Sequence, residues 1–184
     1  LNPDAVVEPA AVRELLACAR AHPEAGIVGG VAVRPDGRHD GRSWFGRPTL
    51  WSAVSFAAGL SSAFPGHPFL DPESSDRWDG RGRTVPAVSG GMMLVDRALW
   101  DRLGGFDRTY FLYGEDVDLC LRASAAGRAP RVCPSARYTH RVGASSAGSN
   151  RLPLVLRGRA TTYRKHLPRP WGGLAARLLV LGTG

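Results

Sequence analysis

The pattern of hydrophobic and polar positions predicts helices that alternate with strands. Behind Pro9, a residue suited to the first turn of a helix, apolar residues recur every three or four positions, so a helix is expected over 9–22. The run at 26–33 is short, apolar and rich in β-branched residues, which is typical of a buried strand. Residues 84–95 have the same character but are interrupted by Ser89-Gly90-Gly91.

The later part of the chain continues this alternation. Asp96 can cap a short helix that ends at Gly104-Gly105, and a further helix is predicted from Glu115 to Ala126. The remaining expected elements are short strands over 130–133 and 137–140 and basic helices over 151–166 and 171–181. Because strands and helices alternate, the sequence predicts an α/β fold with a mostly parallel sheet flanked by helices.

Residues 38–83 show no clear helical or strand period. They are rich in Gly, Pro, Ser, Trp and Arg. We therefore expect a long irregular insertion here, and in a compact domain such a segment is usually functional or mobile.

Charge is divided unequally along the chain. Residues 1–118 carry 16 acidic and 12 basic side chains, whereas residues 119–184 carry 12 basic and no acidic ones, and the whole chain has a net charge of +8. A basic tail of this kind can face nucleic acid, anionic lipid or a diphosphate, although a solvated helix face accounts for the same arginines. The apolar content of 43% excludes a disordered chain, and no apolar run is long enough to span a membrane.

Cysteine usage indicates no metal or redox motif. Cys18, Cys120 and Cys133 are far apart, and no CxxC spacing occurs. We therefore expect neither a zinc knuckle nor a redox pair, and a reducing compartment is the simpler interpretation.

Candidate chemistry is densest around the start of the helix predicted at Glu115. Glu115, Asp116 and Asp118 fall in its first turn, directly after an aromatic loop. Partial positive charge at a helix N-terminus favours an ionised carboxylate, which could take a proton from a substrate hydroxyl as general base. Helix stabilisation by acidic residues explains the same positions. Adjacent residues point about 100° apart around a helix, so Glu115 and Asp116 cannot flank a bond as glycosidase carboxylates do.

Two further candidates lie near predicted strand ends. Asp4, in Asn2-Pro3-Asp4, could hold a hard divalent cation against a diphosphate, although an ordinary turn fits as well. His140 precedes a Gly/Ser loop and could ligate a metal, although most single histidines do not. The sequence has no nucleophile elbow and no Gly-rich phosphate loop, so neither a serine hydrolase nor a nucleotide-binding P-loop is supported.

In order along the chain, these segments resemble a family-2 glycosyltransferase of the GT-A fold, in its rhamnosyltransferase-like branch. The similarity covers most of residues 1–33 and 84–166. The matching segments are 1–4, similar to that branch's DxD motif; 87–95, similar to the strand on the acceptor side; 104–107 with 111–122, similar to the GGFDE…ED block; and 140–146, similar to the closing H-x-x-G-x-S element. Four motifs in the family's order make the resemblance specific.

The resemblance implies an inverting transfer of a sugar from a nucleotide diphosphate to a hydroxyl of a saccharide or polyprenyl-linked saccharide. Cell-envelope polysaccharide synthesis is the implied setting, and the branch suggests rhamnose. Asp116 would be the base that deprotonates the acceptor, and Glu115 would position that base or the acceptor.

The resemblance also implies a donor site and a metal. Asp4 and His140 would hold a magnesium or manganese ion near the donor diphosphate. Asn2, Gly90 and Gly91 would lie against the donor or acceptor. Asn2 replaces the first acidic residue of a full DxD, which weakens the case for metal dependence.

The family's nucleotide-binding half would precede residue 1. We therefore expect residues 1–150 to be the C-terminal part of a GT-A domain, residues 151–184 to be a basic helical extension, and the chain to be inactive by itself. A cytoplasmic location is implied, with the basic tail as a candidate for peripheral contact at the inner face of the plasma membrane, and no nucleic-acid partner is expected. Two alternatives stay open: a non-catalytic arginine-rich module that binds an anionic surface or nucleic acid, and an inactive glycosyltransferase relic.

Overall fold

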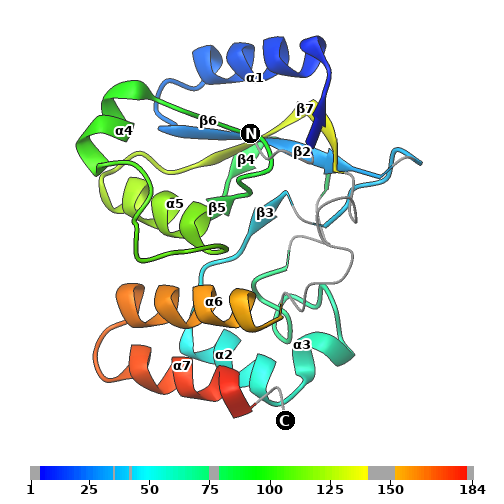
Figure 1. The fold of residues 1–184 in the computed structure, drawn as a ribbon. Helices are drawn as coiled ribbons and strands as arrows, with labels where there is room; N and C mark the ends of the chain where they lie inside the picture. The colour runs from blue at the N-terminus through cyan, green and yellow to red at the C-terminus, as the bar shows by residue number, and fades with distance from the viewer. Residues whose placement is uncertain (1–4, 35, 42, 75–78, 141–151, 182–184) are drawn as a thin grey trace.

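The computed structural model describes residues 5–34, 36–41, 43–74, 79–140 and 152–181 of the chain (Figure 1). Its helices are α1 (Pro9–Ala21), α2 (Leu50–Ala57), α3 (Leu60–Ala63), α4 (Arg97–Leu103), α5 (Glu115–Ala125), α6 (Leu152–His166) and α7 (Trp171–Leu181). Its strands are β1 (Ala5–Val7), β2 (Ile27–Val33), β3 (Trp44–Phe45), β4 (Arg83–Thr84), β5 (Ala87–Val88), β6 (Met93–Val95) and β7 (Arg131–His140).

The helix ends that have a local signal in the sequence were predicted correctly. Pro9 occupies the first turn of α1. The Asp96 side chain caps α4 by accepting the Leu99 N–H at 2.8 Å, and Gly104 ends that helix in the left-handed conformation. The two predicted basic helices near the C-terminus are α6 and α7.

The main sheet is mixed. Its strands run in the order β1-β7-β2-β6, with β4 also paired to β7. The α/β class is confirmed, but the expectation of a mostly parallel sheet is wrong, because only the β2–β7 pairing is parallel among the described strands of this sheet. Strand–helix–strand order predicts a parallel crossover, whereas α1 joins β1 to a strand that runs in the opposite direction.

Strand β7 replaces the two short strands that were predicted. Its register against β2 shifts between Gly29 and Val31, which pair with Val132 and Arg137. The intervening residues of β7 bulge away from β2 around Pro134, which has no N–H to give to the ladder. Proline in the middle of the run made one long strand look like two.

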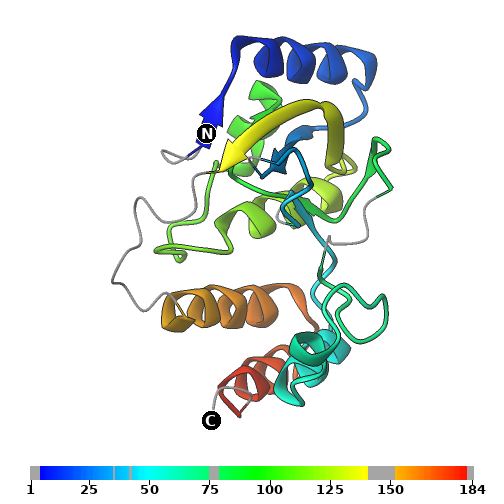
Figure 2. The ribbon, with the colours of Figure 1, turned by 90° about the vertical axis from the view of Figure 1, so that its right-hand side faces the viewer.

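Helices cover both faces of this sheet. Alternate residues of β2 point to opposite faces, so Val28 packs with α1 and Ile27 packs with α4 and α5. Figures 1 and 2 show α1 above the sheet and α5 below it, with β7 curling across the middle.

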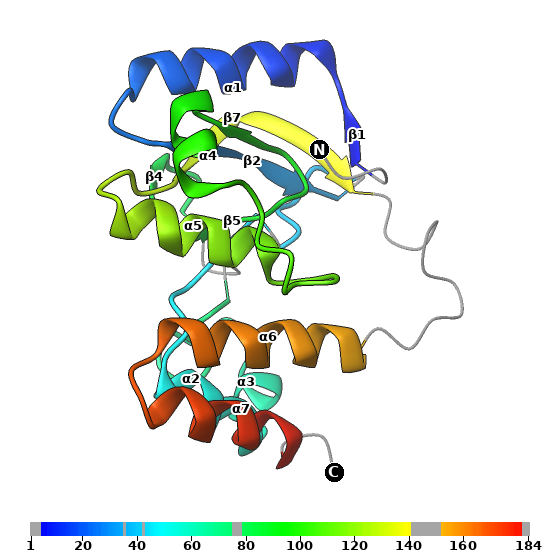
Figure 3. The same cartoon turned by 60° about the vertical axis from the view of Figure 1, so that its left-hand side comes forward.

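Four helices below α5 form a second packing unit, which we call the helical lobe: α2, α3, α6 and α7. Its core comprises Ala53 of α2, Tyr163 of α6, and Ala175 and Leu179 of α7. The lobe joins the segment predicted as an irregular insertion to the C-terminal helices (Figure 3). Among the described residues, no helix has both the length and the apolar character needed to cross a bilayer.

The prediction of an irregular segment over 38–83 is wrong for residues 50–57 and 60–63. Thr49 and Ser52 form a capping box in which the Thr49 hydroxyl accepts the Ser52 N–H at 3.0 Å and the Ser52 hydroxyl accepts the Thr49 N–H at 2.9 Å. Helix α2 is then stabilised by packing against α7, whose sequence lies more than a hundred residues away.

The cysteine spacing favoured a reducing compartment, whereas the structure contains a disulfide. Cys18 of α1 and Cys133 of β7 are joined by a disulfide, and the remaining Cys120 is a buried free thiol. The sheet brings α1 onto β7 and closes a sequence separation of 115 residues, which spacing alone could not reveal.

Reduction of this disulfide is expected to lower the free energy of unfolding by about 2–4 kcal/mol, because the bond restricts a long loop of the unfolded chain. Thermal unfolding with and without a reducing agent measures the loss. The Cys18→Ser variant should unfold at the same lowered temperature under both conditions. Equal midpoints for the unaltered protein with and without reductant, or alkylation of all three thiols before reduction, would contradict the disulfide.

Candidate active site

A strained turn sets the start of α5. Tyr113 and Gly114 both have positive φ, 67° and 93°, and Gly114 is the residue that caps the helix. A Cβ on Gly114 would lie 3.1 Å from Tyr110 Cε1 and 3.2 Å from Thr162 Oγ1, so glycine is needed for space as well as for conformation. A non-glycine residue such as Tyr113 in this region costs energy and is commonly found at functional sites.

This turn aims Asp116 at the glycine pair between β5 and β6. Asp116 Oδ2 accepts the Gly90 N–H at 2.8 Å, and Oδ1 accepts the Val117 N–H at 2.8 Å. Burial raises the pKa of Asp116, although these backbone hydrogen bonds act in the opposite direction. A carboxylate with a raised pKa is a stronger base, provided that it is ionised at the working pH.

Glu115 lies beside Asp116, and one oxygen of its carboxylate has no hydrogen-bond partner among the described residues. Burial raises the pKa of Glu115, and the neighbouring Asp116 charge raises it further. Its Oε2 atom is buried and has no hydrogen-bond partner among the described residues. Because buried polar atoms are normally paired, this oxygen is a candidate acceptor for a donor group of a bound substrate.

Gly91 extends the site to the end of β7. A Cβ on Gly91 would lie 2.9 Å from Tyr138 Cζ, so the backbone there contacts the Tyr138 ring directly. Tyr138 pairs with Val7 of β1, and His140 pairs with Ala5 in the same ladder. Asp116, the glycine pair and the joined ends of β1 and β7 therefore form one continuous region, which we call the candidate site.

Of the predicted metal ligands, the structure describes only the backbone of His140. Asn2 and Asp4 lie outside the described residues, and His140 is described as a strand residue without its side chain. Ala5, which follows Asp4 in sequence, is the register partner of His140. In the part of the chain that the structure describes, no group of three or more His, Cys, Asp or Glu residues is arranged to bind a metal. Metal binding thus stays a prediction.

The third acidic residue of the segment, Asp118, does not belong to the site. It is fully buried and accepts from Arg122 Nε at 2.8 Å, from His166 Nε2 at 2.7 Å and from Lys165 Nζ at 2.7 Å. Burial by itself would raise the pKa of Asp118, but the hydrogen bonds from His166, Lys165 and Arg122 outweigh it and hold the pKa below the ordinary value of 3.8.

Sequence reasoning missed this role of the basic tail. Only the Asp118–Arg122 pair had a local signal, namely its four-residue helical spacing. Arg122 also donates to the carbonyls of Leu103 at 2.9 Å and Gly105 at 2.8 Å, and Lys165 contacts Asp107 at 2.6 Å. The charged cluster around Asp118 therefore ties the 103–107 turn, α5 and α6 together behind the candidate site.

Alanine substitutions at the two glycines of the candidate site are expected to differ in their effect on stability. Gly91→Ala is expected to lower the free energy of unfolding by about 1–3 kcal/mol, because its methyl group must displace the Tyr138 ring. A Cβ on Gly90 has its nearest neighbours at 3.4 and 3.5 Å, both on Asp116, which is ordinary contact, so Gly90→Ala should cost less than about 1 kcal/mol. Urea unfolding of both variants measures this difference, and equal stabilities would contradict the packing described here.

Known proteins share this arrangement of segments. The family model described as "Glycosyltransferase like family 2" matches residues 1–154. The N-acetylglucosaminyl-diphospho-decaprenol L-rhamnosyltransferase of Mycobacterium tuberculosis is 34% identical over 141 residues, which is 76% of this chain and 45% of that protein. The O-antigen biosynthesis protein RfbC of Myxococcus xanthus is 30% identical over 142 residues, 76% of this chain and 10% of that protein.

A shorter similarity points to the same group. Rhamnosyltransferase WbbL of Escherichia coli is 44% identical over 56 residues, 30% of this chain and 21% of that protein. The chain thus spans less than half the length of each of these relatives. Because the family model covers most of the chain, the chain belongs to glycosyltransferase family 2.

Proposed function

We propose that this chain provides the acceptor side of an inverting glycosyltransferase that acts in cell-envelope polysaccharide synthesis. The observation that carries the proposal is the placement of Asp116. It stands at the first turn of α5, its carboxylate is held by the Gly90 N–H, and its pKa is raised by burial. A fixed carboxylate of this kind suits the removal of one proton from a hydroxyl group.

The proposed step needs only that proton transfer and one substitution. Asp116 takes the proton of the acceptor hydroxyl while the hydroxyl oxygen bonds to the anomeric carbon of the donor sugar. The bond from that carbon to the nucleotide diphosphate breaks on the opposite side and inverts the anomeric configuration, and its electron pair leaves with the diphosphate. Glu115, through its unpaired Oε2, would accept a hydrogen bond from a second acceptor hydroxyl and orient the first one.

A divalent ion would offset negative charge on the departing diphosphate. Asp4, which precedes β1 in the sequence, and His140, the last residue of β7, would offer it a carboxylate and an imidazole. Carboxylate oxygens suit magnesium and manganese.

The substrates we propose follow the relatives' names. One relative is named as an L-rhamnosyltransferase that acts on N-acetylglucosaminyl-diphospho-decaprenol, and another as a rhamnosyltransferase. For this protein we propose a nucleotide-diphosphate-linked deoxyhexose as donor, with rhamnose first. A saccharide carried on a polyprenyl diphosphate is the proposed acceptor.

We also propose that residues 1–184 do not catalyse transfer alone. The 141 residues matched to the M. tuberculosis relative cover 45% of that protein's length. In open α/β sheets a ligand binds across the ends of several neighbouring strands, and the described sheet has five strands, of which three have only two or three residues.

Product analysis with the full-length protein tests these proposals. The protein is supplied with a panel of nucleotide sugars and a polyprenyl-linked N-acetylglucosamine, and mass spectrometry and NMR identify the product and its anomeric configuration. We expect transfer of a deoxyhexose with inversion. A folded full-length protein that transfers no sugar would favour the inactive relic, and transfer by residues 1–184 alone would overturn the claim that more chain is required.

A further inference from the structure

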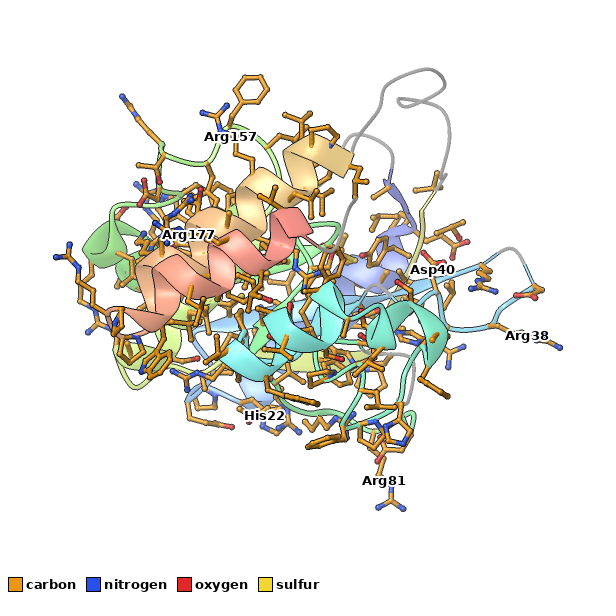
Figure 4. The ribbon with its side chains drawn as sticks, turned by 90° about the horizontal axis from the view of Figure 1, so that it is seen from below. His22, Arg38, Asp40, Arg81, Arg157 and Arg177 are labelled. Atoms are coloured by element: carbon orange, nitrogen blue, oxygen red, sulfur yellow. A yellow bond between two sulfur atoms is a disulfide. The ribbon has the colours of Figure 1, made fainter. Side chains whose placement is uncertain are left out.

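The helical lobe carries a surface that is both apolar and basic. A groove runs along α6 and α7, lined by apolar side chains that include Leu152, Leu156 and Val180 and flanked by Arg157 and Arg164. Figure 4 views this end of the molecule and shows α6 and α7 side by side, with Arg157 and Arg177 labelled on them.

The exposed face of α7 continues this surface. Trp171, Leu174 and Val180 keep 48%, 43% and 70% of their area exposed, which is unusual for large apolar residues. Together with Arg177, which is also exposed, they follow one another at three-residue steps, each turned by about 60° from the last, and so they spread over the exposed half of the helix, opposite its buried half. We call the groove and this helix face together the α6–α7 surface.

The arginines of this surface are not neutralised by the protein. Arg157, Arg164 and Arg177 are exposed and form no ion pair with any described residue. By contrast, Arg159 of the same helix pairs with Glu73 at 3.0 Å, and Lys165 pairs with Asp107 and Asp118. Because residues 119–184 contain no acidic side chain, the α6–α7 surface has no local counter-charge from its own helices.

We propose that the α6–α7 surface binds an anionic phospholipid bilayer, with α7 lying in the plane of the membrane interface. Exposed tryptophan, leucine and valine side chains next to arginines have the composition of interfacial helices, whose apolar side enters the headgroup region while cations contact anionic lipids. The proposal concerns a binding surface outside the candidate site, so it does not depend on the proposed sugar transfer.

Each alternative partner would match either the charge or the apolar character of this surface, but not both. A nucleic acid would pair with the arginines but would leave the aliphatic side chains between them without a partner. A second copy of the chain, docked through the same surface, would cover the apolar residues but would bring like charges together. An anionic bilayer satisfies both features at once.

Membrane binding through the α6–α7 surface would leave the candidate site accessible, because α6 contacts α5 with its other side. Gly158, Thr162 and His166 face α5: a Cβ on Gly158 would lie 2.8 Å from the Tyr113 carbonyl carbon, Thr162 bonds to Tyr110 at 3.2 Å, and His166 bonds to Asp118. Leu156, Arg157 and Arg164 line the groove instead. On a helix with 3.6 residues per turn these two sets lie on opposite sides, so membrane contact along the groove leaves the α5 side of α6 uncovered.

Vesicle sedimentation of the full-length protein tests the proposal. Vesicles of phosphatidylcholine alone are compared with vesicles that also contain phosphatidylglycerol. We expect binding to the anionic vesicles only, weakened by added salt. The triple variant Arg157→Gln/Arg164→Gln/Arg177→Gln is expected to lower the partition coefficient by about 100-fold, since each arginine near an anionic surface contributes several-fold.

A matched variant separates this surface from overall charge. Arg13→Gln/Arg20→Gln/Arg102→Gln removes the same charge from exposed positions on α1 and α4 and should bind as the unaltered protein does. A third variant, Trp171→Gln/Leu174→Gln/Val180→Gln, keeps all arginines and should also lose at least tenfold in vesicle binding. Circular dichroism of each variant checks that the helices are intact.

Each possible result of the vesicle experiments supports or contradicts membrane binding by the α6–α7 surface. Loss of vesicle binding in the first and third variants, but not in the control, supports the proposal. Equal binding by the control and the first variant overturns it, as does an unchanged affinity of the third variant, which would indicate a purely electrostatic surface for nucleic acid. Absence of vesicle binding together with self-association in light scattering would assign the surface to a second copy of the chain.

Discussion

Replacing Asp116 with asparagine is expected to lower kcat of the full-length protein by about 10²–10⁴-fold, the usual contribution of a general base. Asparagine has almost the same shape but cannot take a proton. It keeps one oxygen for the Gly90 or Val117 N–H and loses the other bond, which costs about 1–3 kcal/mol. The fold should therefore survive while the chemical step fails.

Initial rates with saturating donor and acceptor measure this effect. Asp101→Asn is a matched control, because Asp101 lies on the surface of α4 and bonds only to the exposed Arg97 among the described residues. The control should change kcat by less than twofold. If Asp116→Asn retains more than one tenth of the activity while its thermal midpoint is unchanged, Asp116 is not the base.

The pH dependence of kcat/KM offers a second readout of the same residue. Only the ionised form of Asp116 can accept the proton, so activity is lost as the pH falls through its pKa. Because burial raises that pKa, the acid limb of the profile should lie above the ordinary value of 3.8. The limb assigned to Asp116 should be missing from the residual activity of the asparagine variant.

The Asp118→Asn substitution is expected to have the largest effect on stability, a loss of about 3–5 kcal/mol in the free energy of unfolding. It removes the only carboxylate that contacts Arg122 and His166 among the described residues and one of the two that contact Lys165. Arg122 and Lys165 are then left close together without this counter-charge. For a chain of this size the thermal midpoint should fall by roughly 10 °C.

Thermal unfolding and urea titration measure this loss. Asp101→Asn again serves as the control, because its exposed pair with Arg97 contributes about 0.5 kcal/mol or less. Adding Lys165→Gln to Asp118→Asn should recover part of the loss by removing one of the opposed cations. A loss as small as that of the control would show that the cluster around Asp118 does not hold α6 in place.

Low pH should destabilise the protein in the same way as the Asp118→Asn substitution, because it neutralises the same carboxylate. The pKa of Asp118 is lowered in the folded state, so its stabilising contribution is present above the pKa of the unfolded chain, near 3.9, and disappears as the pH falls through the lower folded value. The difference in stability between the unaltered protein and Asp118→Asn should therefore be constant near neutral pH and should shrink below about pH 4.

Elements with local signals were predictable from the sequence, and elements that depend on distant partners were not. Pro9, Asp96 and Gly104 mark helix ends through their own backbone chemistry. Helix α2 has only eight residues and a capping box of Thr49 and Ser52, without the glutamate that would have signalled it. Its apolar side is completed by α7, so nothing nearby in the sequence reveals it.

The candidate site shows the same division. The resemblance and the helix N-terminus both pointed to Glu115 and Asp116, and the structure places them at the start of α5. Their catalytic roles stay predictions. Asp118 looked like a third member of that acidic group, but Lys165 and His166 reach it from the end of α6. No pattern over a few residues could have shown that this carboxylate is internal.

The charged cluster around Asp118 has a consequence for how proteins of this family can be divided and recombined. The family match ends at residue 154, in the first turn of α6, whereas two of the side chains that contact Asp118 lie at 165 and 166. A chain cut at the family boundary would leave the buried Asp118 carboxylate without these two partners. A tail exchanged between relatives would have to bring hydrogen-bond donors for Asp118 at these two positions, and a residue without a side chain at 158, where the helix meets Tyr113. Residues beyond the boundary are therefore free to diverge on the side facing away from α5 but are constrained on the side that meets it.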